Sequence, residues 1–165
     1  MMHLPSDRPV SVQTLILLEA SGDQAGTAIE FRDYVVYQVL RQNKVLKNND
    51  VIGQVKAVVQ WVKDVMVYVK DPVGLELVTS PLVLLDRIKE HGVVYGDCDD
   101  HVVLLLAALT SIGVDAVPVG VKTDPNSRTY THVIVSAFFD GHWVDIDPCA
   151  KHTVQREYGD RLIAG

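Results

Sequence analysis

The spacing of apolar residues changes once along this sequence, close to Gly113. Upstream of this glycine, four segments place apolar residues three or four positions apart, which is the spacing of helices. These segments span residues 23–42, 51–66, 81–91 and 98–112. Downstream, three segments change to a period of two, which predicts strands. They span residues 114–122, 130–139 and 142–147. Helices followed by an antiparallel sheet predict an α+β fold.

Helix ends and one turn are marked by residues suited to those positions. Asp50, Ser80 and Asp97 each stand where a helix N-cap is expected, and a glycine follows the last residue of the third and fourth helices. Asp140 and Gly141 separate the last two strands, and this dipeptide is typical of a two-residue hairpin loop. The boundaries of the helices and of the hairpin are therefore expected from local chemistry.

Length and charge restrict the class of protein. The chain has 165 residues, which predicts a single domain over 1–165. Its net charge of −6 and the lack of a basic run argue against nucleic-acid binding and against attraction to an anionic membrane. No stretch approaches the roughly 18–20 uninterrupted apolar residues of a membrane span. The apolar segment 12–18 has no basic region before it, so a signal peptide is not expected. We expect a cytoplasmic protein.

Cys98 stands at the predicted start of the helix 98–112, directly after the expected cap Asp97. A thiol at this position lies near free backbone N–H groups and the positive end of the helix dipole, which lower its pKa. The neighbouring carboxyl groups of Asp97, Asp99 and Asp100 oppose formation of a thiolate. A thiolate therefore needs a cation close by, and a protonated histidine would supply it.

The register of the hairpin indicates which histidine this is. With Asp140 and Gly141 as the loop, His132 lies diagonal to Asp147 on the same face, at a Cβ separation of roughly 6–8 Å. If this face packs on the N-terminus of the Cys98 helix, then Cys98, His132 and Asp147 form a row. The thiol and the imidazole are then the reactive pair, and the carboxylate orients the ring.

Metal binding is the alternative chemistry for the same cysteine. Cys98 and His101 form one C-x-x-H pair, Cys149 and His152 form another, and such residues are ligands for tetrahedral zinc. A Cys98–Cys149 disulfide is not expected in a cytosolic chain. His101 follows Cys98 by one helical turn and is expected at a partly exposed helix position.

Three short motifs occur in a fixed order: YGDCDD at 95–100, THV at 131–133 and WVDIDP at 143–148. Together they resemble the core of the transglutaminase-like superfamily, whose members share a papain-like arrangement of cysteine, histidine and aspartate. The segment 61–81 resembles the helix and loop that precede the cysteine in short bacterial and phage-type members. The resemblance covers about residues 50–149, and more weakly the helix before them.

The resemblance implies a role for each matching residue. Cys98 corresponds to the nucleophile, His132 to the general base and acid, and Asp147 to the orienting carboxylate. The implied reaction is acyl transfer from an amide of a peptide or protein through a thioester, without a cofactor. We find no match to the aromatic oxyanion partner of animal transglutaminases, because Trp61 fits a core position, and no recognisable calcium site. Both differences favour a hydrolase over a crosslinking enzyme. A catalytically silent phage structural module is a further alternative.

Overall fold

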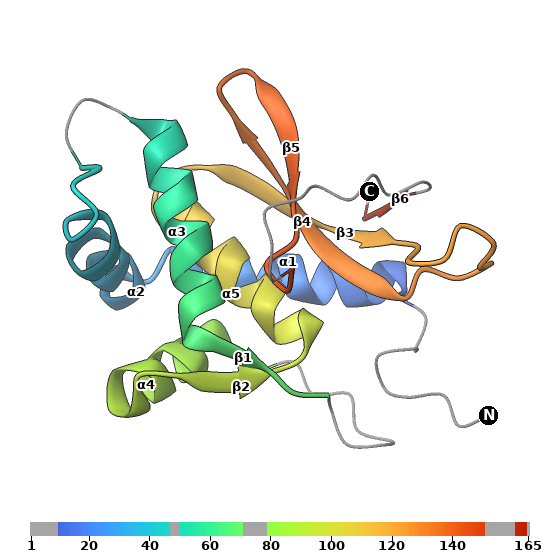
Figure 1. The fold of residues 1–165 in the computed structure, drawn as a ribbon, viewed down its shortest axis with the longest axis horizontal. Helices are drawn as coiled ribbons and strands as arrows, with labels where there is room; N and C mark the ends of the chain where they lie inside the picture. The colour runs from blue at the N-terminus through green and yellow to red at the C-terminus, as the bar shows by residue number, and fades with distance from the viewer. Residues whose placement is uncertain (1–9, 47–49, 71–78, 151–160, 165) are drawn as a thin grey trace.

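The computed structural model describes residues 10–46, 50–70, 79–150 and 161–164, and Figure 1 shows how their helices and strands are arranged. The helices are α1 (Val12–Gly26), α2 (Ile29–Tyr34), the π-helical η2 (Val35–Leu40), α3 (Val51–Val65), α4 (Pro81–His91) and α5 (Cys98–Ser111). The strands are β1 (Met66–Tyr68), β2 (Val94–Gly96), β3 (Asp115–Val121), β4 (His132–Phe139), β5 (His142–Ile146) and β6 (Arg161–Ile163). This order confirms the predicted α+β fold.

The main sheet has the strand order β5-β4-β3-β6, and all of its neighbouring strands are antiparallel. The hairpin of β4 and β5 has the predicted register, since Phe139 pairs with His142 and Val135 pairs with Ile146. Asp140 and Gly141 have φ angles of 53° and 81°. Positive φ at both loop residues is the requirement of a type I′ turn, which explains why this dipeptide fixes the register.

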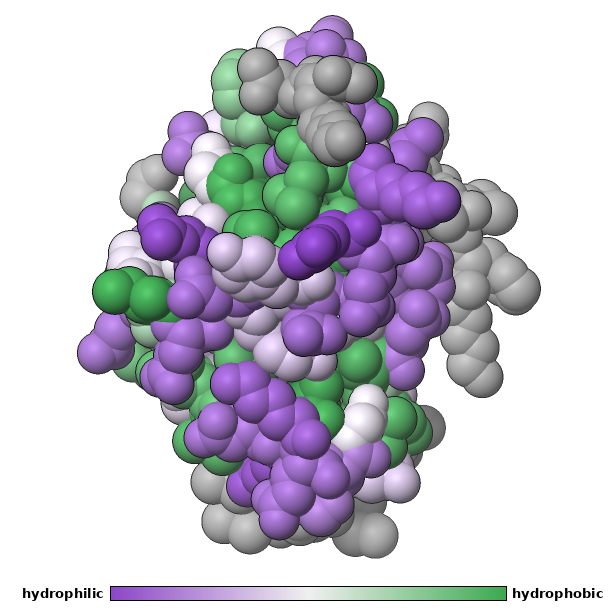
Figure 2. Space-filling view, turned by 90° about the vertical axis from the view of Figure 1, so that its left-hand side faces the viewer, coloured by the Kyte–Doolittle hydropathy of each residue, from purple (hydrophilic) through white to green (hydrophobic). Residues whose placement is uncertain are grey.

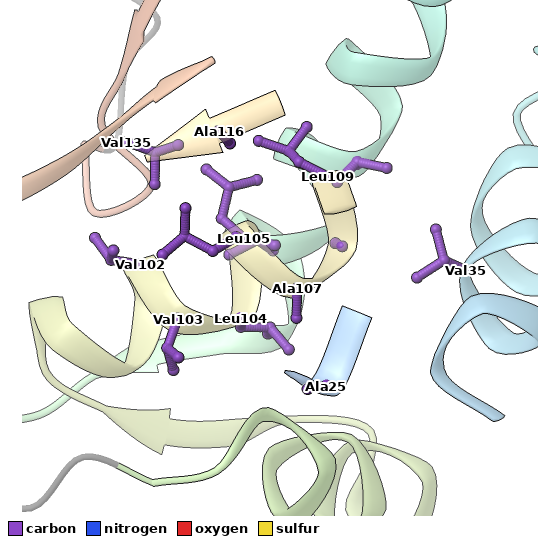
Figure 3. Close-up of a cluster of buried hydrophobic side chains, with 14 of the residues drawn as sticks. Ala25, Val35, Val102, Val103, Leu104, Leu105, Ala107, Leu109, Ala116 and Val135 are labelled. Carbon is purple, nitrogen blue, oxygen red and sulfur yellow. The ribbon is translucent and has the colours of Figure 1, made fainter. Parts of the chain in front are cut away.

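Helix α5 is the central element of the core. Every residue from Asp99 to Leu109 is buried, because the helix lies between the sheet and the other helices. Figure 3 shows Val102 and Leu105 directed toward Val135 of β4, while Val103 and Leu104 point to the opposite side of the helix. A helix buried over this length cannot shift or tilt without opening cavities on several sides, so the position of its N-terminal residue is restricted.

Helix α1 packs closely on α5 through two glycines. A Cβ atom on Gly22 would lie 2.7 Å from the Cβ of Leu106, and one on Gly26 would lie 2.8 Å from the carbonyl oxygen of Ala107. The sequence predicted a single helix over 23–42. That boundary is wrong, because α1 begins at Val12 and the helical conformation is interrupted between Gly26 and Ile29, where α2 begins. The contact face of α1 depends on small residues, which hydrophobic periodicity does not register.

Three short strands were also missed. Helix α3 ends at Val65, and Met66 begins β1 instead of completing the helix. Strand β1 pairs in parallel with β2, and β6 pairs with β3. Each has only three residues, too few to establish a period. The β1–β2 pair matters for the site, because β2 leads directly into Asp97 and Cys98.

The face on the side of α2, α3 and α4 carries mainly hydrophilic side chains, with smaller hydrophobic patches between them (Figure 2). Within the described ranges, no helix combines the length and the apolar character needed to cross a membrane.

The α1–α5 contact yields a stability prediction. Gly22→Ala should lower the free energy of unfolding by about 1–3 kcal/mol, because overpacking against the Leu106 Cβ outweighs the gain of about 1 kcal/mol in helix propensity. Chemical denaturation would measure it. As a control, Ala20→Gly at an exposed position of the same helix should cost about 1 kcal/mol by propensity alone. A stabilised Gly22→Ala protein would contradict the close helix contact.

Candidate active site

The N-terminus of α5 is closed by a reciprocal capping box. An Asp97 carboxylate oxygen accepts hydrogen bonds from the N–H groups of Asp99 at 3.1 Å and Asp100 at 3.2 Å. The Asp100 carboxylate in turn accepts the N–H of Asp97 at 3.3 Å and, through its other oxygen, the N–H of Thr79 at 3.0 Å. The predicted cap is confirmed. Gly96 precedes it because any larger residue would place a Cβ 2.6 Å from the Asp100 side chain.

His132 and Asp147 form the contact that the hairpin register predicts. The His132 Nε2 atom lies 2.8 Å from Asp147 Oδ2, and both side chains are less than one-fifth exposed. The second carboxylate oxygen of Asp147 accepts the backbone N–H of Cys149 at 3.0 Å. Since a carboxylate only accepts, Nε2 donates and Nδ1 is the basic nitrogen of the neutral ring. The carboxylate therefore fixes both the orientation and the tautomer of His132.

Cys98 reaches the start of β4 through the backbone of the neighbouring strand residue. The N–H of Val133 donates a hydrogen bond to the Cys98 thiol, and Val133 follows His132 directly in the chain. The thiol itself approaches the Asp99 carboxylate, with 4.0 Å between Sγ and Oδ1. Helix α5 and the strand that carries His132 thus meet at this point.

Along the body of α5, the face of β4 that packs on the helix is not the face that carries His132, while the charges of Asp147 and His132 still act on residues at its N-terminus. The core shared with α5 contains Val133, Val135 and Ala137 of β4, so His132 leaves the strand on the opposite face. The face of His132 also carries Ser136 and, on β5, Asp145, beside a separate buried apolar cluster of Val119, Val121 and Ile134. The thiol meets the sheet through the Val133 backbone, not through packing of the His132 face.

The surroundings of Cys98 raise the pKa of its thiol. Burial is the largest cause, followed by the negative charges of Asp99 and Asp97, and Asp147 adds to the effect. The hydrogen bond from Val133 acts in the other direction. The predicted lowering by the helix dipole is therefore outweighed. The resting residue is a neutral thiol, and it becomes a nucleophile only where a base removes its proton.

His101 lies beside this site and is buried, with 3% of its surface exposed, which corrects the expectation of a partly exposed position. Its Nδ1 lies 2.7 Å from the carbonyl oxygen of Asp97, and its ring centroid is 6.0 Å from that of Tyr68. Burial lowers its pKa, and the charges of Asp147 and His132 also act on it. Its spacing of four residues from Asp97, one turn along the helix, was the available sequence signal.

Neither the zinc alternative nor a disulfide finds support in the described residues. Cys98 and Cys149 are both free thiols, and burial raises the pKa of Cys149 well above its ordinary value. Cys98, His101 and Cys149 do not form a metal-binding group of three, nor do any other such side chains within the described ranges. The fourth proposed ligand, His152, lies outside those ranges. Trp61 packs on Tyr34 at the edge of the core, with ring centroids 5.9 Å apart, as expected.

Comparison with known proteins adds one finding. No curated protein matches the chain, and no solved structure matches it. The family model of the transglutaminase-like superfamily matches residues 38–148, a range that begins in η2 and ends just after Asp147. Because this match covers more than half of the 165 residues, the chain belongs to the transglutaminase-like superfamily.

Proposed function

We propose that this protein is a thiol hydrolase that cleaves amide bonds of a peptide or protein through a thioester on Cys98. The observation that carries the proposal is the meeting of two groups at the start of β4. One is the His132–Asp147 pair, with 2.8 Å between Nε2 and Oδ2. The other is the Cys98 thiol, which accepts a hydrogen bond from the backbone N–H of Val133, the residue after His132. Membership of a superfamily that consists largely of thiol enzymes adds support.

In the first half of the reaction, His132 Nδ1 takes the thiol proton while Sγ attacks the carbonyl carbon of the amide. The carbonyl oxygen becomes an oxyanion, and the backbone N–H of Cys98 donates to it. The Asp97 carboxylate binds the N–H groups of Asp99 and Asp100. It therefore does not occupy the N–H of Cys98, which supports this role. The C–N bond then breaks as His132 returns the proton to the leaving amine, and a thioester remains on Cys98.

In the second half, water attacks the thioester with His132 again as the base. The carboxylic acid leaves, and the thiol recovers its proton. Asp147 stabilises the imidazolium that forms in each half and holds Nε2 so that Nδ1 serves as the base. An amine in place of water would give transamidation, and the mass of the product distinguishes the two outcomes.

Replacement of His132 tests the proposed base. His132→Ala should slow alkylation of Cys98 by iodoacetamide several-fold at pH 7.5, and should reduce amide hydrolysis by about 10²–10⁴-fold, the usual contribution of a general base. Site-resolved mass spectrometry would follow alkylation, and a panel of peptide amides would report hydrolysis. His142→Ala, at an exposed position of the hairpin, is the matched control. Equal reactivity of Cys98 and Cys149, unchanged by His132→Ala, would refute the nucleophile assignment.

Removal of a neighbouring charge tests the electrostatics of the thiol. Asp99 raises the pKa of Cys98, so Asp99→Asn should lower that pKa and increase the thiolate fraction at any given pH. The pH profile of Cys98 alkylation should therefore shift to lower pH. Asp86→Asn, at an exposed position of α4, should leave the profile unchanged. A shift in the opposite direction would show that Asp99 acts on the thiol by some route other than its charge.

A further inference from the structure

His101 is a buried polar side chain that the proposed reaction does not use. Within the described part of the chain, its ring makes one hydrogen bond, from Nδ1 to the carbonyl oxygen of Asp97 at 2.7 Å. The backbone N–H of His101 donates to the same oxygen at 3.1 Å, as the first bond of the helix. The Asp97 carbonyl thus receives two donors, one of which is required for the helix and one of which is additional.

That carbonyl belongs to the same planar peptide unit as the N–H of Cys98. In a trans peptide the C=O and the N–H point in opposite directions, so a carbonyl held along the helix directs the Cys98 N–H out of the helix end. A hydrogen bond to the carbonyl also polarises the unit and strengthens its N–H as a donor. The ring of His101 therefore acts on both the direction and the strength of this donor.

We propose that His101 is a positioning residue that aligns the peptide unit between Asp97 and Cys98, so that the Cys98 N–H binds the oxyanion of the acylation step. This inference rests on the proposed function, in which Cys98 forms a thioester. The local chemistry suits the role. The helix after His101 is apolar and buried from Val102 to Leu109. If position 101 served packing alone, an aliphatic side chain would suit it better than a histidine. A neutral ring supplies a donor without adding a positive charge next to His132.

Two replacements separate the hydrogen bond from packing. His101→Asn keeps a donor at the position of Nδ1 but loses ring volume, whereas His101→Leu keeps more volume and loses the donor. Both are made in a Cys149→Ser background, which leaves Cys98 as the only cysteine among the two in the chain. A purely structural role predicts that the asparagine variant is the worse of the two. A positioning role predicts the reverse order for acylation.

Two reagents separate the oxyanion from the reactivity of the thiol. With p-nitrophenyl acetate, Sγ forms a bond to the acetyl carbon through an oxyanion, p-nitrophenolate leaves with the C–O electron pair, and the thiol proton passes to His132. Iodoacetamide alkylates the same thiol by displacing iodide, without an oxyanion. His101→Leu should slow acylation about 10-fold, a part of the roughly 10²–10³-fold cost of losing a whole oxyanion donor. It should change alkylation less than about 2-fold, and His101→Asn should restore acylation.

The outcomes are distinguishable. An equal loss in both reactions, or a lower acylation rate for the asparagine variant than for the leucine variant, would overturn the positioning role. If the unmodified Cys98 is acylated no faster than a free cysteine, the proposed function fails before His101 is considered. Thermal melting of each variant shows whether a rate loss reflects unfolding, and rates are compared at a temperature where all variants remain folded.

Discussion

The burial of α5 from Asp99 to Leu109 is the constraint on which the site depends. Asp99 and Asp100 are buried at the start of this helix, and a buried N–H group without a partner costs about 1–3 kcal/mol. Asp97 and Asp100 meet this requirement from within the chain, through the reciprocal capping box. The box takes up the N–H groups of Asp99 and Asp100. Cys98, the proposed nucleophile, is therefore the first residue of a helix in which the Asp97 carboxylate binds the next two N–H groups.

Carboxylates that stabilise the helix end work against the thiol beside them. The charges of Asp97 and Asp99 raise the pKa of Cys98, in addition to its burial. A resting thiolate is therefore disfavoured, in contrast to what the helix dipole alone would produce. Stabilisation of the helix and activation of the thiol are therefore assigned to different residues. The carboxylates stabilise the N-terminus of α5, and the activation that we propose for the thiol is assigned to the His132–Asp147 pair on β4 and the segment after β5.

The parts of this arrangement that were predictable are those fixed by local chemistry. The cap at Asp97 and the register set by Asp140 and Gly141 follow from short-range rules, and the register alone was sufficient to bring His132 to Asp147. The missed features depend on tertiary contacts. Gly22 and Gly26 are weakly hydrophobic, yet they form the close contact with α5. The face of the sheet that meets α5 could not be inferred either, since Val133 and Ile134 are equally apolar and point to opposite sides.

The two histidines near Cys98 differ in ways that their surroundings explain. His132 is paired with a carboxylate, with 2.8 Å between Nε2 and Asp147 Oδ2. His101 is buried and hydrogen-bonded to a backbone carbonyl, and burial lowers its pKa, which favours the neutral ring. A ring of the second kind is a poor base but a constant donor. The same residue type is therefore proposed to transfer protons on the strand and to align a peptide unit on the helix, and the two surroundings differ in burial and in the charge of the hydrogen-bond partner.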